Sequence, residues 1–130
     1  MLDHISIRVS DYERSKRFFE AALAPLGYTL LFEHGISGAG FGRSGKPDFW
    51  IKQGQPSPSL HIAFASEDRA MVDAFYKAAM SCNGRDNGAP GLRPEYHSTY
   101  YGAFVLDPDG HNIEAVCHKP RVNECPSVAR

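Results

Sequence analysis

The sequence predicts an α+β fold made of two copies of one strand and helix module. An internal repeat is the first observation behind this prediction. The segment from Leu2 to Ile7 recurs as Ser59 to Phe64, and the offset of 57 residues holds without a gap as far as Gly27 and Gly84. The second observation is that strand and helix patterns follow in the same order in each copy. One such unit cannot bury its apolar face alone, so the two copies are expected to pack together.

Three boundaries divide the chain. The first module is expected over residues 1–53, a linker with two prolines over 54–59, and the second module over 60–118. The pattern ends after Pro120, so residues 119–130 are expected to form a loose C-terminal tail. At this length the two modules share one core, and the chain is expected to be one structural domain.

The first module begins with a strand. Ile5 to Val9 alternates apolar and polar side chains, which is the period of a half-buried strand. Ser10 or Asp11 can cap the helix that follows, because a short side-chain oxygen accepts from the free N–H groups of the first turn. Further strands are predicted over 28–32 and 48–52, with tight hairpin turns in the glycine-rich stretch 35–45.

The second module repeats this order. A strand is predicted over 61–65, and Ser66 is expected to cap the helix after it. Residues 87–97 hold several glycines and prolines and are predicted to form a loop. Two closing strands are expected over 100–106 and 112–117, joined by a tight turn.

The composition is that of an ordinary globular protein and narrows the possible partners. The net charge is −1 and no basic run is longer than a pair, which argues against nucleic acid and anionic membranes as partners. No apolar stretch approaches the ~20 residues that span a bilayer, and no signal peptide is expected. The three cysteines, Cys82, Cys117 and Cys125, lack C-x-x-C spacing and fit reduced thiols, so a cytoplasmic location is predicted.

The most specific motif closes the second module. His4 leads the first strand, His61 leads its repeat, and residues 104–114 read FVLDPDGHNIE. With these residues the chain, over about 1–118, resembles the vicinal oxygen chelate superfamily, which includes glyoxalase I, extradiol dioxygenases, fosfomycin-resistance transferases and bleomycin-resistance proteins. The resemblance implies two tandem βαβββ modules that form a curled mixed-sheet cup around a metal site. It also implies a homodimer, and in some members modules of two chains complete the cup.

Three side chains are candidates for metal ligands. Two imidazoles and one carboxylate form a facial triad that leaves positions open on a divalent metal ion, and His4, His61 and Glu114 supply these groups. Glu114 stands between two apolar residues, and a carboxylate inside a core strand is costly unless it is paired or bound to metal. We therefore predict that these three residues bind Fe, Mn, Ni, Co or Zn. The alternative is that Glu114 pairs with Arg8 and no metal binds.

The chain departs from glyoxalase I at one position. That family takes a second acidic ligand from the last strand of the first module, where this chain has Trp50 or Ile51, depending on the gap. Neither side chain can bind a metal ion. A three-ligand site, as in dioxygenases and fosfomycin-type transferases, therefore fits better. Against the transferases, no cluster of lysine and arginine is present for a phosphonate.

Two further residues are candidates for a catalytic role; the alternative is that His97 is a surface loop residue and that Tyr101 serves only in packing. Tyr101 and His97 flank the long loop before the strand that pairs with the strand of Glu114, and loops at such places often close over ligands. Either side chain could act as an acid or a base on a bound substrate. Tyr100 would face the opposite way from Tyr101, so only one of the two tyrosines can point at the metal.

Substrate contacts are expected from the first module. Ser6 and Arg8 share the strand face of His4, and this face is more polar than one that only packs against other elements. Trp50 is expected in the core or in the wall of the cup. We predict that Ser6, Arg8 and Trp50 contact a small-molecule substrate.

These residues predict a metal-dependent enzyme whose substrate binds the metal through two adjacent oxygens. The metal would act as a Lewis acid in lyase or isomerase chemistry, or, as ferrous iron, would bind dioxygen and a diol. A non-catalytic binding protein of the bleomycin-resistance type and a structural dimer without a pocket are the competing classes. The sequence leaves open the substrate, the metal, and whether the two histidines meet within one chain or across a dimer.

Overall fold

The computed structural model describes residues 1–121 of the chain. The first module consists of β1 (Ile5–Val9), α1 (Tyr12–Leu23), the 3-10 helix η1 (Ala24–Leu26), β2 (Thr29–Glu33), β3 (Ala39–Arg43) and β4 (Lys46–Gln53). The second consists of β5 (His61–Ala65), α2 (Arg69–Met80), β6 (Arg85–Leu92), β7 (Tyr101–Leu106) and β8 (Asn112–Cys117). The predicted α+β fold of two βαβββ modules is confirmed.

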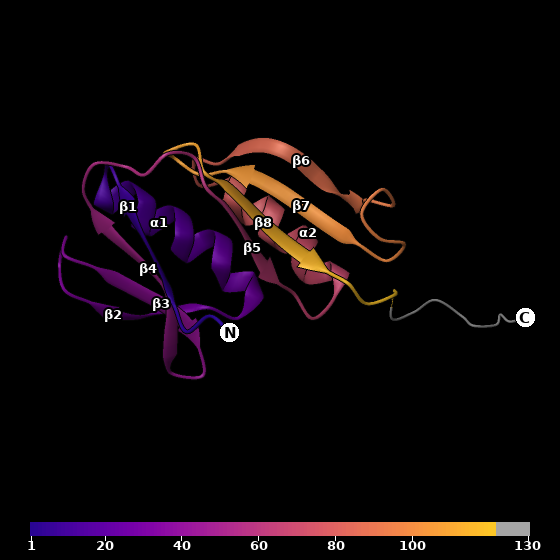
Figure 1. The fold of residues 1–130 in the computed structure, drawn as a ribbon, viewed down its shortest axis with the longest axis horizontal. Helices are drawn as coiled ribbons and strands as arrows, with labels where there is room; N and C mark the ends of the chain where they lie inside the picture. Colours follow the sequence, from indigo (N-terminus) through magenta and orange to yellow (C-terminus); the bar gives the residue numbers. More distant parts are fainter. Residues whose placement is uncertain (122–130) are drawn as a thin grey trace, which may run out of the picture.

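Each module forms one four-stranded mixed sheet. The strand orders are β1-β4-β3-β2 and β5-β8-β7-β6, and the first strand of each module is parallel to the last. The two sheets lie side by side along the long axis of the molecule (Figure 1). Helices α1 and α2 contact each other, so the helical sides of both modules share one core.

Strand register shows which residues of the two modules are equivalent. In the first module Ser6 on β1 lies opposite Trp50 on β4, and in the second Ala63 on β5 lies opposite Glu114 on β8. Ser6 and Ala63 each stand two residues after the leading histidine of their module. Trp50, rather than Ile51, is therefore the counterpart of Glu114.

Aromatic rings join the two modules. Phe64 of β5 packs edge-on against Tyr28 and Phe49 of the first module, with ring centroids 5.5 Å apart in both pairs. A polar contact adds to this: Asp109, in the turn before β8, accepts from the backbone N and the hydroxyl of Ser10 at 3.0 and 2.5 Å. Both contacts cross between modules, so the modules are expected to fold as one unit.

The helix caps differ in part from the predictions. Asp11 caps α1, since its side chain accepts from the backbone N of Arg14 at 3.2 Å. Ser66 was expected to cap α2 and does not; Asp68 does so, accepting from the backbone N of Met71. The prediction failed because Ser66 still extends the sheet, where its backbone N donates to the carbonyl of Val116.

Two stretches predicted as turns or loop contain strands. β3 lies inside the glycine-rich stretch 35–45, and the predicted loop over 87–97 is wrong for its first half, which belongs to β6. β6 is the edge of its sheet and pairs with β7 through two register shifts. An edge strand with bulges tolerates glycine and proline, and this is why the composition of β6 resembled that of a loop.

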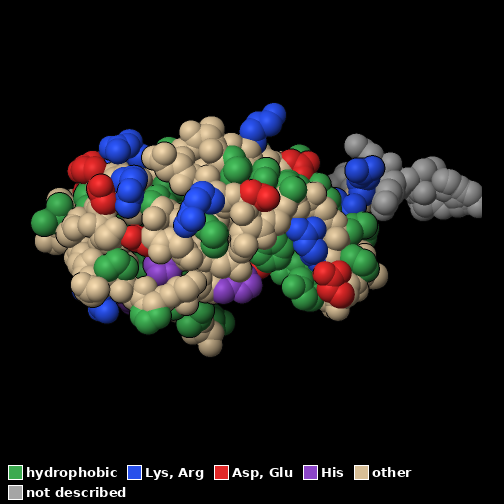
Figure 2. Space-filling model, turned by 90° about the horizontal axis from the view of Figure 1, so that it is seen from above, with side chains coloured by type: hydrophobic (Ala, Val, Ile, Leu, Met, Phe, Trp, Pro, Cys, Tyr) green, Lys and Arg blue, Asp and Glu red, His purple; other side chains and the backbone are tan. Residues whose placement is uncertain are grey.

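The surface carries mixed charge. On the face shown in Figure 2, basic and acidic side chains are interspersed and neither sign gathers into a patch. No helix within residues 1–121 is long and apolar enough to cross a membrane. Cys82 and Cys117 are free thiols, whereas Cys125 and most of the predicted tail, 119–130, lie outside the described residues.

Candidate metal centre

The second module brings two of the predicted ligands together. Glu114 lies in the middle of β8 and is completely buried, and His61 opens the neighbouring strand β5 with 55% of its side chain exposed. Oε1 of Glu114 lies 2.7 Å from Nε2 of His61. A carboxylate next to an imidazole nitrogen is a donor pair that suits a divalent metal ion. Solvent therefore reaches this pair at the imidazole of His61 but not at the carboxylate of Glu114.

Tyr100 holds the other oxygen of the carboxylate. Its hydroxyl donates to Oε2 of Glu114, and burial together with this carboxylate raises the pKa of Tyr100 to about 12. The hydroxyl therefore stays protonated at neutral pH and remains a donor. Gly102 lets the two side chains approach, because a Cβ there would lie 3.1 Å from the Tyr100 ring and 3.3 Å from Oε2. One oxygen of Glu114 is thus fixed and the other faces His61.

An aromatic ring and a cation stand beside this pair. Phe104 lies opposite Glu114 in the register of β7 and β8, and its ring is 6.2 Å from the ring of His61. The guanidinium of Arg93 lies 5.3 Å from the centre of the Phe104 ring, within the range of a cation–π contact. Neither Phe104 nor Arg93 was predicted to lie in the site.

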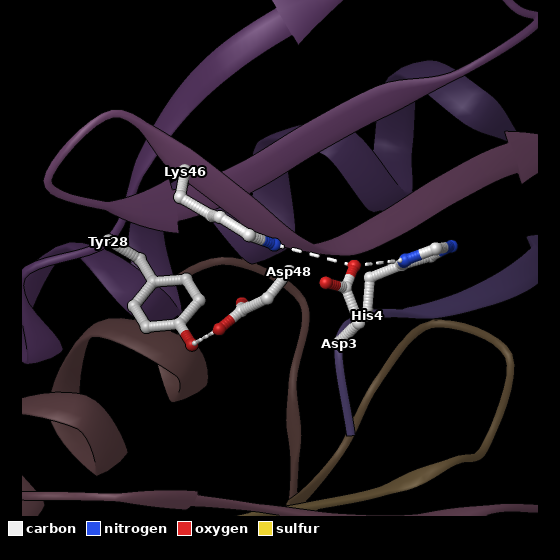
Figure 3. A network of polar contacts seen from close by, with 5 residues as sticks. All are labelled: Asp3, His4, Tyr28, Lys46 and Asp48. Atoms are coloured by element: carbon white, nitrogen blue, oxygen red, sulfur yellow. Dashed lines mark hydrogen bonds and ion pairs between the residues drawn. The ribbon is translucent and has the colours of Figure 1, made fainter. Parts of the chain in front are cut away.

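His4 is held by a carboxylate in the first module. Nδ1 of its ring lies 2.8 Å from Oδ1 of Asp3, and 57% of its side chain is exposed (Figure 3). Hydrogen bonds from His4 and Lys46 lower the pKa of Asp3, so Asp3 is ionised and can only accept. Nδ1 is therefore the donor and Nε2 of a neutral ring keeps its lone pair. Carboxylates commonly orient histidine ligands of metals in this way.

His4 lies apart from the other two predicted ligands. It lines a cleft of about 190 Å³ between the modules, together with Tyr28, Asp48 and residues 62–65, but not with His61 or Glu114. Tyr28 donates to Asp48 at 3.0 Å within this cleft (Figure 3). Among residues 1–121 of one chain, no three His, Cys, Asp or Glu side chains are grouped closely enough to hold a metal ion. A single chain thus presents the predicted ligands as two separate sets.

The predicted substrate contacts lie on the face of β1 and β4 that points away from the helices. Ser6 and Arg8 are exposed there, and Trp50 is half-buried opposite Ser6. Nε of Arg8 donates to the carbonyl of Gln55 at 2.9 Å. The alternative pairing of Glu114 with Arg8 is not formed, because Glu114 contacts His61 and Tyr100 in the other module.

The structure places neither predicted catalytic residue against Glu114. The hydroxyl of Tyr101 donates to Asp73 of α2 at 2.7 Å, on the helical side of the sheet. His97 is exposed, and its ring packs against His118 at 5.7 Å. Tyr100 takes the place expected for Tyr101. The register of β7 and β8 explains this: Phe104 pairs with Glu114 and lies on the same face of the sheet, so the even-numbered residues here share that face.

Comparison with known proteins assigns the chain to a family. The model of the Glyoxalase/Bleomycin resistance protein/Dioxygenase superfamily matches residues 1–115. The chain belongs to this superfamily. The predicted resemblance is therefore confirmed. Members of the superfamily include enzymes and typically bind a divalent metal ion.

Solved structures support the fold of this superfamily member. A glyoxalase/bleomycin resistance protein from Albidiferax ferrireducens T118 is 30% identical, with a TM-score of 0.77, covering 92% of this chain and 99% of that one. A glyoxalase-related enzyme from Fulvimarina pelagi is 18% identical, with a TM-score of 0.70 and coverage of 90% and 87%. A lactoylglutathione lyase from Agrobacterium tumefaciens is 12% identical, with a TM-score of 0.66 and coverage of 90% and 92%. None of the curated proteins matches the chain.

Proposed function

We propose that this protein is a metal-dependent enzyme that acts on a small substrate with two adjacent oxygens. His61 and Glu114 of one chain and His4 of a partner chain would hold a divalent metal ion, of Fe, Mn, Ni, Co or Zn. The observation that carries the proposal is the completely buried carboxylate of Glu114, whose Oε1 faces the half-exposed ring of His61. The reduced thiols of Cys82 and Cys117 fit the cytoplasmic location that we include in the proposal.

A structural role alone accounts poorly for Glu114. Removing a carboxylate from water is expensive, and the contacts to it are an imidazole and a neutral phenol rather than a fixed cation. The neighbouring strand residues are apolar and would pack without it. A divalent cation bound at Oε1 would compensate for the buried charge.

The separation of His4 from His61 within one chain favours a site shared by two chains. Each module has one leading histidine, which stands two residues before the position of its first strand that pairs with Trp50 or Glu114. In a two-fold dimer, the first module of one chain can face the second module of its partner, which gives two equal sites. His4, with Nε2 free, would then complete the set begun by His61 and Glu114.

The chain's own residues prepare this site. Tyr100 holds Oε2 of Glu114, so the carboxylate would offer only its other oxygen to a metal ion. More coordination positions on the metal would then be left for substrate oxygens. Asp3 orients the ring of His4. When bound, the metal would supply Lewis acidity, which stabilises negative charge on the substrate oxygens. Arg93, next to Phe104, adds positive charge on the same side of the module.

Mixed dimers test the shared site. His4→Ala and His61→Ala chains would be produced separately with two different affinity tags, neither of them polyhistidine, and then refolded together. The purified mixed dimer contains one intact set, made of His4 from the His61→Ala chain and of His61 and Glu114 from the His4→Ala chain. We expect about one tightly bound metal ion per mixed dimer and almost none in either parental dimer.

The parental dimers and the wild type calibrate this experiment. Wild-type protein is expected to hold about two metal ions per dimer. A mixed dimer without metal would place all ligands within one chain and would contradict the shared site. Full metal content in either parental variant would remove that histidine from the ligand set. Protein that sediments as a monomer while retaining metal would also contradict the proposal.

Replacing Tyr100 with phenylalanine tests the fixed carboxylate. The ring is kept and only the donor to Glu114 is lost, so we expect metal affinity to fall about 10–100-fold, as for other residues that orient a ligand. A chelator competition measures this affinity. Tyr101→Phe, which loses a hydroxyl on the helical side, is the matched control and should leave the affinity unchanged. Equal affinities in the two variants would remove Tyr100 from the site.

A further inference from the structure

Trp50, the counterpart of Glu114 in the first module, lies with its ring flat against glycine backbone of β3. A Cβ placed on Gly40 of β3 would lie 2.8–2.9 Å from three carbons of the six-membered ring of Trp50, and one on Gly38 would lie 3.8 Å from a fourth carbon. Similar distances to three carbons of one ring indicate a face-on contact. One face of the indole therefore rests on β3, where any larger residue at Gly40 would displace it.

Phe32 extends this flat surface. Its ring is inclined by only 21° to the indole, with the ring centroids 6.3 Å apart, and 50% of Phe32 is exposed. Phe32 of β2 and Trp50 of β4 lie on either side of Gly40 of β3, which is the register partner of both. We call Trp50 and Phe32 the aromatic floor. It is continuous with the face that carries Ser6 and, two residues earlier, His4.

We propose that the aromatic floor binds the planar aromatic ring of the substrate, which would then be an aryl compound carrying two adjacent oxygens. This inference rests on the proposed function. Stacking needs a flat and partly exposed π surface. Offset-stacked aromatic pairs contribute more binding free energy than their buried area alone would give. The floor lies next to His4, so a ring on it can direct its oxygens toward the proposed ligands.

Simple packing does not account for the arrangement. Glycine inside a strand weakens the strand, and it often marks a place where another group comes close to the backbone. Here that group is an indole that is only half-buried, beside a phenylalanine that is half-exposed. A side chain placed only for core packing would be buried, as the neighbouring Phe49 is at 1% exposure.

Binding of matched diols to metal-free protein tests the aromatic floor. Protein freed of metal with a chelator and then dialysed would be titrated by calorimetry with 2,3-dihydroxynaphthalene and with cis-1,2-cyclohexanediol, which has the two oxygens but no aromatic ring. We expect the aryl diol to bind and the alicyclic diol to bind at least about tenfold more weakly. Trp50 is the only tryptophan, so its fluorescence gives a second readout of the same site.

Four variants separate binding on the aromatic floor from binding elsewhere on the protein. Trp50→Leu and Phe32→Leu should each weaken binding of the aryl diol, the first about tenfold, whereas Trp50→Phe should retain most of the affinity. Tyr76→Leu removes an aromatic ring from α2 and is the matched control, expected to bind as the wild type does. Phe32 is half-exposed, so its variant keeps the test valid if Trp50→Leu does not fold.

The outcomes distinguish this inference from the proposed function. The titration uses metal-free protein, so its result does not depend on whether the proposed metal ligands are correct, and metal content tests those ligands separately. Wild-type protein that binds neither diol would overturn the inference, as would equal binding by Trp50→Leu, Phe32→Leu and Tyr76→Leu. If Trp50→Leu dissociates a dimer without changing the affinity for the aryl diol, the floor is a subunit contact and the inference is wrong.

Discussion

Replacing Glu114 with glutamine is expected to abolish tight metal binding while the fold is kept. Glutamine has the same shape and can still accept the hydrogen bond from Tyr100, but it carries no charge and its amide is a poor metal ligand. Loss of a direct ligand should cost more than the about 10–100-fold that loss of an orienting partner costs. Because Glu114 is buried, the neutral amide should be no more costly to the fold than the carboxylate.

The measurement is metal content by elemental mass spectrometry, on protein purified without a polyhistidine tag or a chelator. Glu67→Gln is the matched control: this carboxylate also lies in the second module, but it is exposed and pairs with Lys119 at 2.9 Å. We expect metal in the wild type and in Glu67→Gln, and almost none in Glu114→Gln. Unchanged metal in Glu114→Gln would mean that the proposed ligand set is wrong.

The metal found would decide which reaction to assay. Iron would favour ring cleavage of an aryl diol with dioxygen, and nickel or zinc would favour lyase or isomerase chemistry. If wild-type protein neither carries metal nor takes it up, a non-catalytic binding protein becomes the better hypothesis. The aromatic floor of Trp50 and Phe32 suits a sequestered aryl ligand equally well.

Much of the fold was predictable because the chain repeats itself. Strand alternation located β1, β5 and β8 to within a residue, and the repeat showed that His4 and His61 occupy equivalent positions. Local composition was misleading at β6, where pairing at a bulged sheet edge outweighs the glycines and prolines. It also failed at Ser66, where continued sheet pairing delays the start of α2. In both cases the deciding contacts come from strands distant in the sequence.

The candidate site was predictable in its residue types but not in its arrangement. Motif and alternation placed Glu114 beside His61, yet only the register shows that Trp50 replaces the fourth ligand. Alternation allowed either Tyr100 or Tyr101 to face the site, and the direction depends on how β7 pairs with β8. The distance between His4 and His61 depends on how the modules pack, which no local pattern reveals.

Replacing Phe49 with alanine is expected to cause the largest loss of stability. Phe49 is 1% exposed and packs edge-on against Phe19 of α1 at 4.9 Å and Phe64 of β5 at 5.5 Å. Truncating a buried phenylalanine removes its transfer free energy and leaves a cavity, which together cost about 3–5 kcal/mol. That is a large part of the about 5–15 kcal/mol that stabilises a typical domain.

Urea unfolding measures this loss through the midpoint and the slope of the transition. Phe32→Ala is the matched control, since the same truncation on a half-exposed ring should cost less than about 1 kcal/mol. Phe49 contacts the second module through Phe64, so the variant should still unfold in one transition in which both modules take part. Two separate transitions, or equal losses in the two variants, would contradict a shared core. The expected contrast arises from one step along β4: Phe49 faces the helices and stabilises both modules, and Trp50 faces away from them, where a ligand can reach it.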